Sequence, residues 1–227
     1  MGKQPSYEYA KFAKIHPTTG RYTNQGFQAR VTLPSSKSLP QGGSYINTYC
    51  GMAGFECGVS VKYRADFKDS RTGTYQWHWF VNGPEQDDGP MCEYRDGDSV
   101  HIKLVRLDNK HVEFWVNGAR KFTSANAYGE STYATDDTCA RYIIASEITR
   151  WNALPSSLPN WNLSFSRLQI SEMMFKDSHG SWINVNSGNA TARLSHTPVQ
   201  LTAPSPADYN GVSNDLASGR FAVSMSV

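Results

Sequence analysis

Apolar residues recur at every second position through most of the chain, and this alternation restricts the possible fold more than any other feature. In SVHIKLVRL, Val100, Ile102 and Leu104 share one side, while His101 and Lys103 share the other. A period of two places alternate side chains on opposite faces of a β-strand. The chain is therefore expected to be built from strands that each bury one face.

Two of these segments are joined as a hairpin. The segment 111–116 alternates in the same way, and the short polar stretch 108–110 connects it to the strand before it. Asn117-Gly118 then ends the second segment with a strong turn signal. This arrangement predicts an antiparallel meander.

Further strands are expected along the rest of the chain. Their ranges are 27–33, 43–49, 57–67, 74–82, 141–149, 163–175, 182–185, 199–202 and 221–226. The apolar phase slips near Ser166-Arg167, which predicts a β-bulge there. Clear amphipathic helix patterns are absent. About ten strands at such spacings favour an all-β fold, a two-sheet antiparallel sandwich of the jelly-roll type.

A length of 227 residues suits a single β-sandwich domain covering residues 1–227. Hydrophobic residues make up 39% and charged residues 19% of the chain, a balance typical of a folded protein. We find no internal repeat and no linker that would divide the chain. The segments 1–25 and 204–220 are expected to be irregular.

Charge and hydropathy exclude two classes of partner. The net charge of +2 comes from scattered basic residues, whereas a nucleic-acid binder usually concentrates them. No run approaches the roughly 18 apolar residues that a membrane helix needs.

The N-terminal segment lacks the apolar core of a signal peptide. We expect a secreted or surface-exposed protein in its mature form, with a cytoplasmic protein as the alternative.

The four cysteines offer two interpretations. An even number without a CxxC pair favours two disulfides and an oxidising compartment. Cys50 and Cys57 would close a short loop, which leaves Cys92 with Cys139. The alternative is four buried free thiols.

No cofactor or metal is expected. The spacing of cysteines and histidines excludes a structural zinc site. Short acidic turns such as Asp87-Asp88 and Asp96–Asp98 leave a weaker case for calcium. Phosphate-binding glycine loops and a GxSxG nucleophile elbow are both missing.

Aromatic residues supply the candidate ligand-binding groups. In YQWHWF, Trp77 and Trp79 share one face of the expected strand and His78 lies on the other. If the two indoles lie on a concave face, they form a stacking platform for a sugar or an apolar peptide. In the alternative interpretation both rings fill the core. Trp115 is better placed for exposure because it lies on the polar phase of its strand.

Two carboxylates are the catalytic candidates. Glu56 and Glu147 are each embedded in apolar β sequence, GFECGV and IIASEIT. Two carboxylates on one concave surface can divide acid and base roles when their environments separate their pKa values. A solvated acid at a strand edge is the alternative for either residue.

From residue 43 to residue 175 the order of motifs resembles the glutamic peptidases, or eqolisins. The motifs are SYINTYCGMAGFECGV, QWHWF, DGDSVHIKLV and TCARYIIASEIT, in that order. This resemblance implies a concanavalin-like jelly roll of two curved sheets. In the family a Gln and a Glu act together, with Glu as general base and Gln stabilising the tetrahedral intermediate. The Gln position falls on Glu56 and the Glu position on Ala145, so the catalytic pair is not retained.

The expected function is binding without catalysis. We expect a jelly roll that holds a glycan or an extended peptide in a concave cleft. The alternative is an acid endopeptidase, or another hydrolase, that uses Glu56 with Glu147, two residues beyond Ala145 on the same strand face. A structural or adhesive module is the third possibility.

Overall fold

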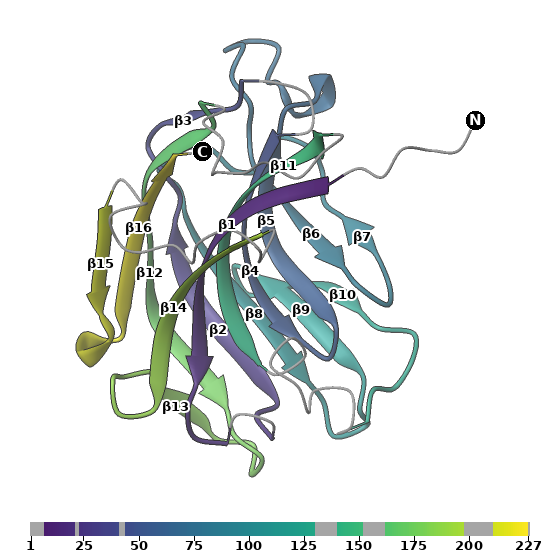
Figure 1. Ribbon diagram of the computed structural model, residues 1–227. Coiled ribbons are helices and arrows are strands. Elements are labelled where there is room, and N and C mark those ends of the chain that lie inside the picture. Colours follow the sequence, from purple (N-terminus) through teal and green to yellow (C-terminus); the bar gives the residue numbers. More distant parts are fainter. Residues whose placement is uncertain are drawn as a thin grey trace.

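Antiparallel strands in two stacked sheets make up nearly all the regular structure (Figure 1). The computed structural model describes residues 7–20, 23–40, 44–129, 140–151, 162–197 and 211–226. The helical parts among these residues are single turns at Ala65–Phe67 and Leu216–Ser218. The all-β, two-sheet sandwich expected from the alternation is confirmed. No helix within these ranges is long and apolar enough to span a membrane.

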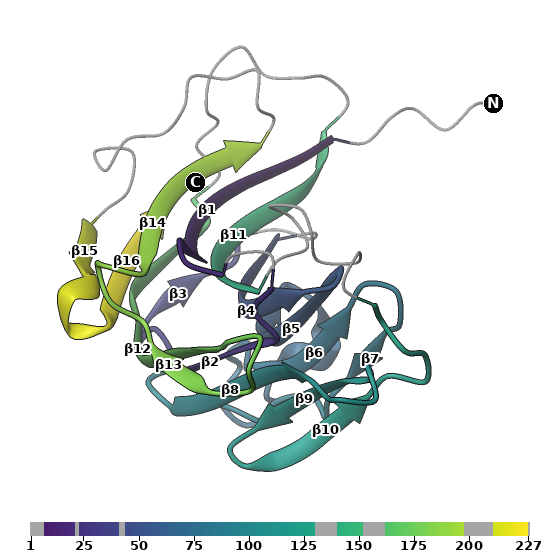
Figure 2. The ribbon, with the colours of Figure 1, turned by 90° about the horizontal axis from the view of Figure 1, so that it is seen from below.

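One sheet has seven strands. Its order is β14 (Ala190–Thr197), β1 (Tyr7–Pro17), β11 (Arg141–Trp151), β4 (Ser44–Met52), β5 (Phe55–Lys62), β6 (His78–Asn82) and β7 (Asp87–Asp88). Figure 2 shows that β14, β1 and β11 bend away from the level of β4–β7. This curvature makes the outer face of the sheet concave.

The other sheet has nine strands. Its main path is β10 (Ala119–Thr123), β9 (Val112–Val116), β8 (Ser99–Arg106), β2 (Gly26–Thr32), β12 (Ser164–Lys176), β16 (Arg220–Ser226) and β15 (Gly211–Asp215). Two short strands, β3 (Lys37–Ser38) and β13 (Trp182–Asn184), also pair with β12. This sheet wraps around the back of the curved seven-stranded sheet (Figure 2).

The core lies between the two sheets and is supplied by alternate residues of each strand. Val100, Ile102 and Leu104 of β8 are fully buried in it, as their period of two predicts. From the opposite sheet, Val59 and Val61 of β5 enter the same hydrophobic cluster. Burial of this shared apolar surface is the main force that holds the sheets together.

Two local predictions on the nine-stranded sheet are confirmed. Strands β8 and β9 form the expected antiparallel meander, and β10 follows the Asn117-Gly118 turn. Both turn residues have positive φ, of 49° and 78°, as a type I′ hairpin turn requires. The register of β12 against β16 shifts between Phe165 and Leu168, where the bulge was expected.

The expectation of irregular ends is wrong for two segments. Tyr7–Pro17 forms β1, which lies between β14 and β11, and Gly211–Asp215 forms β15. The alternation of β1 was hidden because lysine occurs on both phases: Lys11 is on the phase of the core residues Ala13 and Ile15, and Lys14 is on the other. The expected strand 199–202 lies outside the described residues.

Two other strands are shorter than predicted, and four more were missed. The segment 57–67 stays extended only to Lys62 before the turn at Ala65–Phe67. In 74–82 the regular strand begins at His78, preceded by single bridges at Tyr75 and Trp77. The missed strands are β14, which pairs with β1, and the shorter β3, β7 and β10.

The cysteines correct the disulfide prediction, because Cys50, Cys57 and Cys92 are free thiols. Cys50 and Cys57 are directly opposite each other on β4 and β5, and both point into the core. Burial raises the pKa of both thiols, so they remain protonated. Cys139 lies outside the described residues. The prediction of an oxidising compartment therefore loses this support.

Candidate functional site

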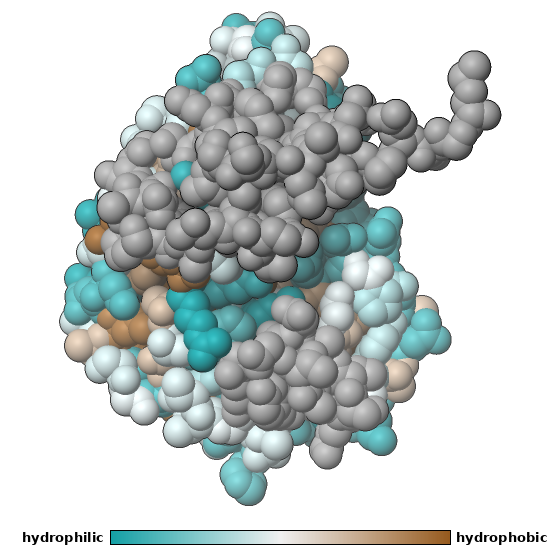
Figure 3. All heavy atoms as spheres, viewed as in Figure 1, coloured by the Kyte–Doolittle hydropathy of each residue, from teal (hydrophilic) through white to brown (hydrophobic). Residues whose placement is uncertain are grey.

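The concave outer face of the seven-stranded sheet is the candidate site. Along β5, Phe55, Cys57, Val59 and Val61 enter the core, so the residues between them belong to the outer face. Seen from this side, the described surface carries a band of hydrophilic residues across its hollow (Figure 3). Three successive rows of register partners cross this face and define its chemistry.

The first row places a cation beside an acid. Arg141 on β11 is opposite Gly51 on β4, and Gly51 is opposite Glu56 on β5. Arg141 is only 5% exposed, and its Nη2 lies 4.0 Å from Oε1 of Glu56. The Glu56 side chain is 33% exposed. The row therefore offers a carboxylate to solvent with a buried guanidinium next to it.

The second row is largely apolar. It contains Ile143, Tyr49, Gly58 and Phe80, with Phe12 of β1 packed against the cluster. The rings of Tyr49 and Phe80 meet edge to face, with their centroids 6.0 Å apart.

Tyr49 also joins this apolar row to the first row. Its hydroxyl donates a hydrogen bond of 3.1 Å to Oε1 of Glu56. A Cβ at Gly58 would lie 2.5 Å from Cα of Tyr49, so only glycine allows β4 and β5 to approach this closely. The position of Tyr49 beside Glu56 thus depends on a glycine in the neighbouring strand.

The third row contains buried polar groups. Asn47, Ser60 and His78 are register partners on β4, β5 and β6. Oδ1 of Asn47 and Oγ of Ser60 are buried and have no hydrogen-bond partner among the described residues. Such atoms cost free energy unless a water or a ligand satisfies them. This row is therefore the polar floor of the site.

His78 is part of this floor and does not face solvent. Its Nδ1 donates to the carbonyl oxygen of Ser60 at 2.9 Å, and its Nε2 lies 3.3 Å from Oδ1 of Asp88. Burial lowers the pKa of His78, although the bond to Ser60 and the carboxylate of Asp88 oppose that shift. We therefore assign His78 a structural role between β5, β6 and β7.

The two tryptophans of this strand region correct the prediction of an exposed stacking platform. Trp77 is fully buried and Trp79 is 6% exposed, and both belong to the core cluster. Nε1 of Trp77 donates to Oδ1 of Asp96 at 2.8 Å, and Trp79 packs against Phe114 of the other sheet. The alternative interpretation, that both rings fill the core, is confirmed.

Trp115 lies on the other sheet, away from the candidate site. It is half-buried on the outer face of β9, where Lys103 Nζ is 4.4 Å from its ring centroid. Its Nε1 donates to Oε2 of Glu113 at 3.0 Å. The structure therefore does not bring Trp115 together with Trp77, Trp79 or His78 in one site.

The two predicted catalytic acids occupy distant rows. Glu147 on β11 is opposite Tyr45 on β4, whereas Glu56 on β5 is opposite Gly51. From Tyr45 to Gly51 is six residues, which is about 20 Å along a strand. Two carboxyl groups that act through one water lie at most about 10 Å apart. The register thus disagrees with a Glu56/Glu147 pair.

Sequence reasoning did not select two residues of the site, Arg141 and Tyr49. A signal for Arg141 was present, because it shares the period-two phase of Glu147 on the same expected strand. The sequence could not show that Arg141 would lie beside Glu56. This neighbour is set by the register of β11 against β4, which pairs Arg141 with Gly51.

No protein-family model matches the chain, and no curated protein matches it either. The chain is similar in structure to scytalido-glutamic peptidase with a peptide-based transition-state analogue. That likeness has a TM-score of 0.58 and 11% sequence identity, over 96% of this chain and 98% of the other.

A second similar structure is SCP-B, an eqolisin-family peptidase in complex with the tripeptide Ala-Ile-His. It has a TM-score of 0.54 and 11% identity, over 96% of this chain and 98% of that one. At such identities the likeness shows the fold alone. The chain therefore has a two-sheet jelly-roll fold similar to that of these two peptidases.

Proposed function

We propose that the concave face of the seven-stranded sheet binds an extended peptide without cleaving it. The observation that carries this proposal is the Glu56 carboxylate, which is exposed on the concave face beside the buried guanidinium of Arg141 and the hydroxyl of Tyr49. Peptide recognition combines polar groups that bind the main chain with apolar contacts for the side chains. On this face Glu56 supplies an exposed acceptor for main-chain N–H groups. Tyr49, Phe80 and Ile143 are buried beneath the surface, so they support this acceptor rather than contact the peptide.

Three further points favour a peptide over a glycan and binding over hydrolysis. The indoles expected to stack on sugars, Trp77 and Trp79, are in the core. The two similar structures are complexes with a peptide-based transition-state analogue and with a tripeptide. The register separates the backbone positions of Glu56 and Glu147 by about 20 Å along the strands, which favours binding over a mechanism with one shared water.

Binding is tested with a fluorescein-labelled library of random decapeptides, read by fluorescence anisotropy. Glu56→Gln removes the charge that faces Arg141, and we expect it to weaken binding about five-fold. Glu172→Gln is the matched control, since Glu172 forms an ion pair with Arg30 on the other sheet. Equal weakening by both variants, or no binding by the wild type, would overturn the proposal.

Catalysis is tested separately. Wild type, Glu56→Gln and Glu147→Gln are incubated with a denatured protein between about pH 2 and 5, where a carboxylate pair that shares a proton would act. We expect no cleavage products from any of the three. Cleavage that is present in the wild type and lost in either variant would establish the hydrolase instead.

A further inference from the structure

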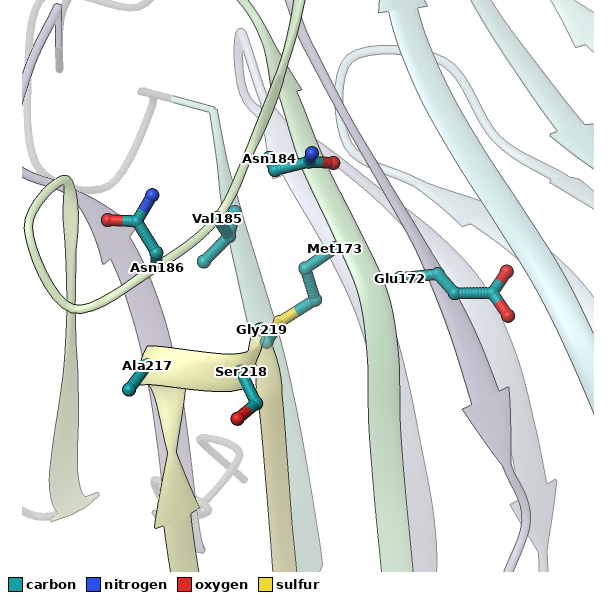
Figure 4. Close-up of a pocket in the computed structure, with 8 residues that line it drawn as sticks. All are labelled: Glu172, Met173, Asn184, Val185, Asn186, Ala217, Ser218 and Gly219. Carbon is teal, nitrogen blue, oxygen red and sulfur yellow. The ribbon is translucent and has the colours of Figure 1, made fainter.

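A pocket of about 350 Å³ lies on the nine-stranded sheet, away from the concave face. Strand β12 pairs with β16 up to Ile170 and with β13 from Met174 onward, on the same edge. The pocket opens where this edge passes from one partner to the other (Figure 4). Met173 and Val185 lie at its floor, and residues 217–219 form one wall.

Two unusual backbone positions create this opening. Glu172 has a φ of 51°, and the register of β12 against β2 shifts between Ser171 and Met174, so β12 carries a second bulge here. Gly219 has a φ of 64°, and a Cβ there would lie 3.0 Å from the carbonyl oxygen of Val185. Bulges and strained residues often mark binding sites.

The polar groups of the pocket are neutral and available. Neither the Asn184 amide nor the Ser218 hydroxyl makes a side-chain hydrogen bond within the described residues, and both are exposed. The Asn186 amide oxygen accepts from the backbone N–H of Gly188 at 2.8 Å, which leaves its Nδ2 group as a donor.

The charged group at the rim is already paired. The Glu172 carboxylate accepts from Nε of Arg30 at 2.9 Å, and it points away from the other lining residues (Figure 4). An ionic ligand therefore has no free countercharge among the described lining groups. Uncharged donors and acceptors above an apolar floor suit a ligand that alternates hydroxyl groups with C–H surface.

We propose that this pocket binds a single pyranose ring, either free or as the terminal residue of a glycan. Its volume is near the lower end of the range of about 300–1,000 Å³ found for ligand pockets, which fits one ring. In Figure 4 the polar ends of Asn184, Asn186 and Ser218 point outward from the pocket, so these exposed side chains turn inward to hydrogen-bond the sugar hydroxyls. Met173 and Val185 contact the C–H face of the ring. This site is separate from the peptide site on the concave face.

The test uses the methyl glycosides of glucose, galactose and N-acetylglucosamine with ¹⁵N-labelled protein. We expect at least one sugar to shift the side-chain amide signals of Asn184 and Asn186, with a dissociation constant in the millimolar range. Asn184→Ala and Ser218→Ala should each weaken binding about five-fold. Asn214→Ala, an exposed asparagine of β15 outside the pocket, should leave it unchanged.

Two outcomes would overturn the proposal. One is the absence of any shift in these amide signals with all three sugars up to about 50 mM, a limit that corresponds to very weak binding. The other is sugar binding that Asn184→Ala and Ser218→Ala leave intact. Glu56→Gln serves to separate the two sites, because it should leave the sugar-induced shifts unchanged while it weakens peptide binding.

Discussion

The guanidinium of Arg141 lies over Gly51: a Cβ on that glycine would lie 3.0 Å from Cζ of Arg141. The two residues are register partners on β11 and β4, and Glu56 follows on β5. The missing side chain at position 51 thus sets how close the buried cation comes to the exposed carboxylate. It makes the polar row of the concave face possible.

This relationship predicts the effect of a single methyl group. In Gly51→Ala the new Cβ must displace the Arg141 side chain, so peptide affinity should fall about three-fold or more. Gly211→Ala is the control, because a Cβ there meets no atom within 4 Å. Both variants are compared by anisotropy with the labelled decapeptides. Unchanged affinity in Gly51→Ala would show that the position of Arg141 does not matter for binding.

The buried position of Trp77 predicts a stability effect rather than a binding effect. Trp77→Phe removes the indole N–H that donates to Asp96 and leaves unfilled space in the core, which should cost about 2 kcal/mol of unfolding free energy. Trp115→Phe, at a half-buried surface position, should cost under about 1 kcal/mol. Urea unfolding measures both changes. A larger loss in Trp115→Phe would contradict the assignment of Trp77 to the core.

Glu85 predicts a pH-dependent contribution to stability. Its carboxylate accepts from the backbone N–H groups of Ala125 and Asn126 and from the hydroxyl of Tyr128. Burial raises the pKa of Glu85, but these hydrogen bonds together outweigh it, so its pKa is lowered from the usual 4.5. An acid with a lowered pKa stabilises the fold above its unfolded pKa, and this stability is lost as the pH falls through its folded pKa.

Glu85→Gln should therefore destabilise the protein by about 1 kcal/mol near neutral pH. The difference from wild type should shrink as the pH falls below 4.5, because both side chains are then uncharged. Urea unfolding at several pH values gives the comparison. If the difference in unfolding free energy between wild type and Glu85→Gln were the same at all pH values, the effect would come from the altered side-chain geometry and not from the charge of Glu85.

The free thiols predict a pattern of chemical reactivity. Cys50 and Cys57 are fully buried, and burial raises the pKa of both, so iodoacetamide should leave them unmodified in the folded protein. After unfolding in urea without a reductant, both should react, as read by peptide mass spectrometry. A cross-linked Cys50–Cys57 peptide from a non-reduced digest would show that these two cysteines form a disulfide and are not free thiols.

The strands that sequence patterns predicted correctly are those whose two faces differ strongly. In β8, aliphatic residues alternate with His101 and Lys103, so the pattern shows both the strand and its buried side. In β1, alanine and lysine occur on both phases, and its extended state comes from pairing with β14 and β11. A local pattern does not contain that information.

The same limit explains the candidate site. Alternation correctly grouped Trp77 with Trp79 and placed His78 on the opposite face, but it did not show which face meets the second sheet. Tertiary packing decided that both indoles lie inside. Glu56, which was selected because it is embedded in apolar β sequence, lies on the outer face of β5. Its neighbours Arg141 and Tyr49 depend on the registers of β4 with β11 and β5. Such registers join residues that are far apart in the chain.

The central position of β1 has a consequence for how the protein is made. Tyr7–Pro17 can pair only with β11, which begins at Arg141, and with β14, which ends at Thr197. On the ribosome, β1 therefore cannot make its native pairings until β11 has been synthesised. Such long-range pairings slow folding and leave early strands open to wrong partners. A chaperone that holds the nascent N-terminal segment would raise the yield of folded protein more than one that acts on the finished chain.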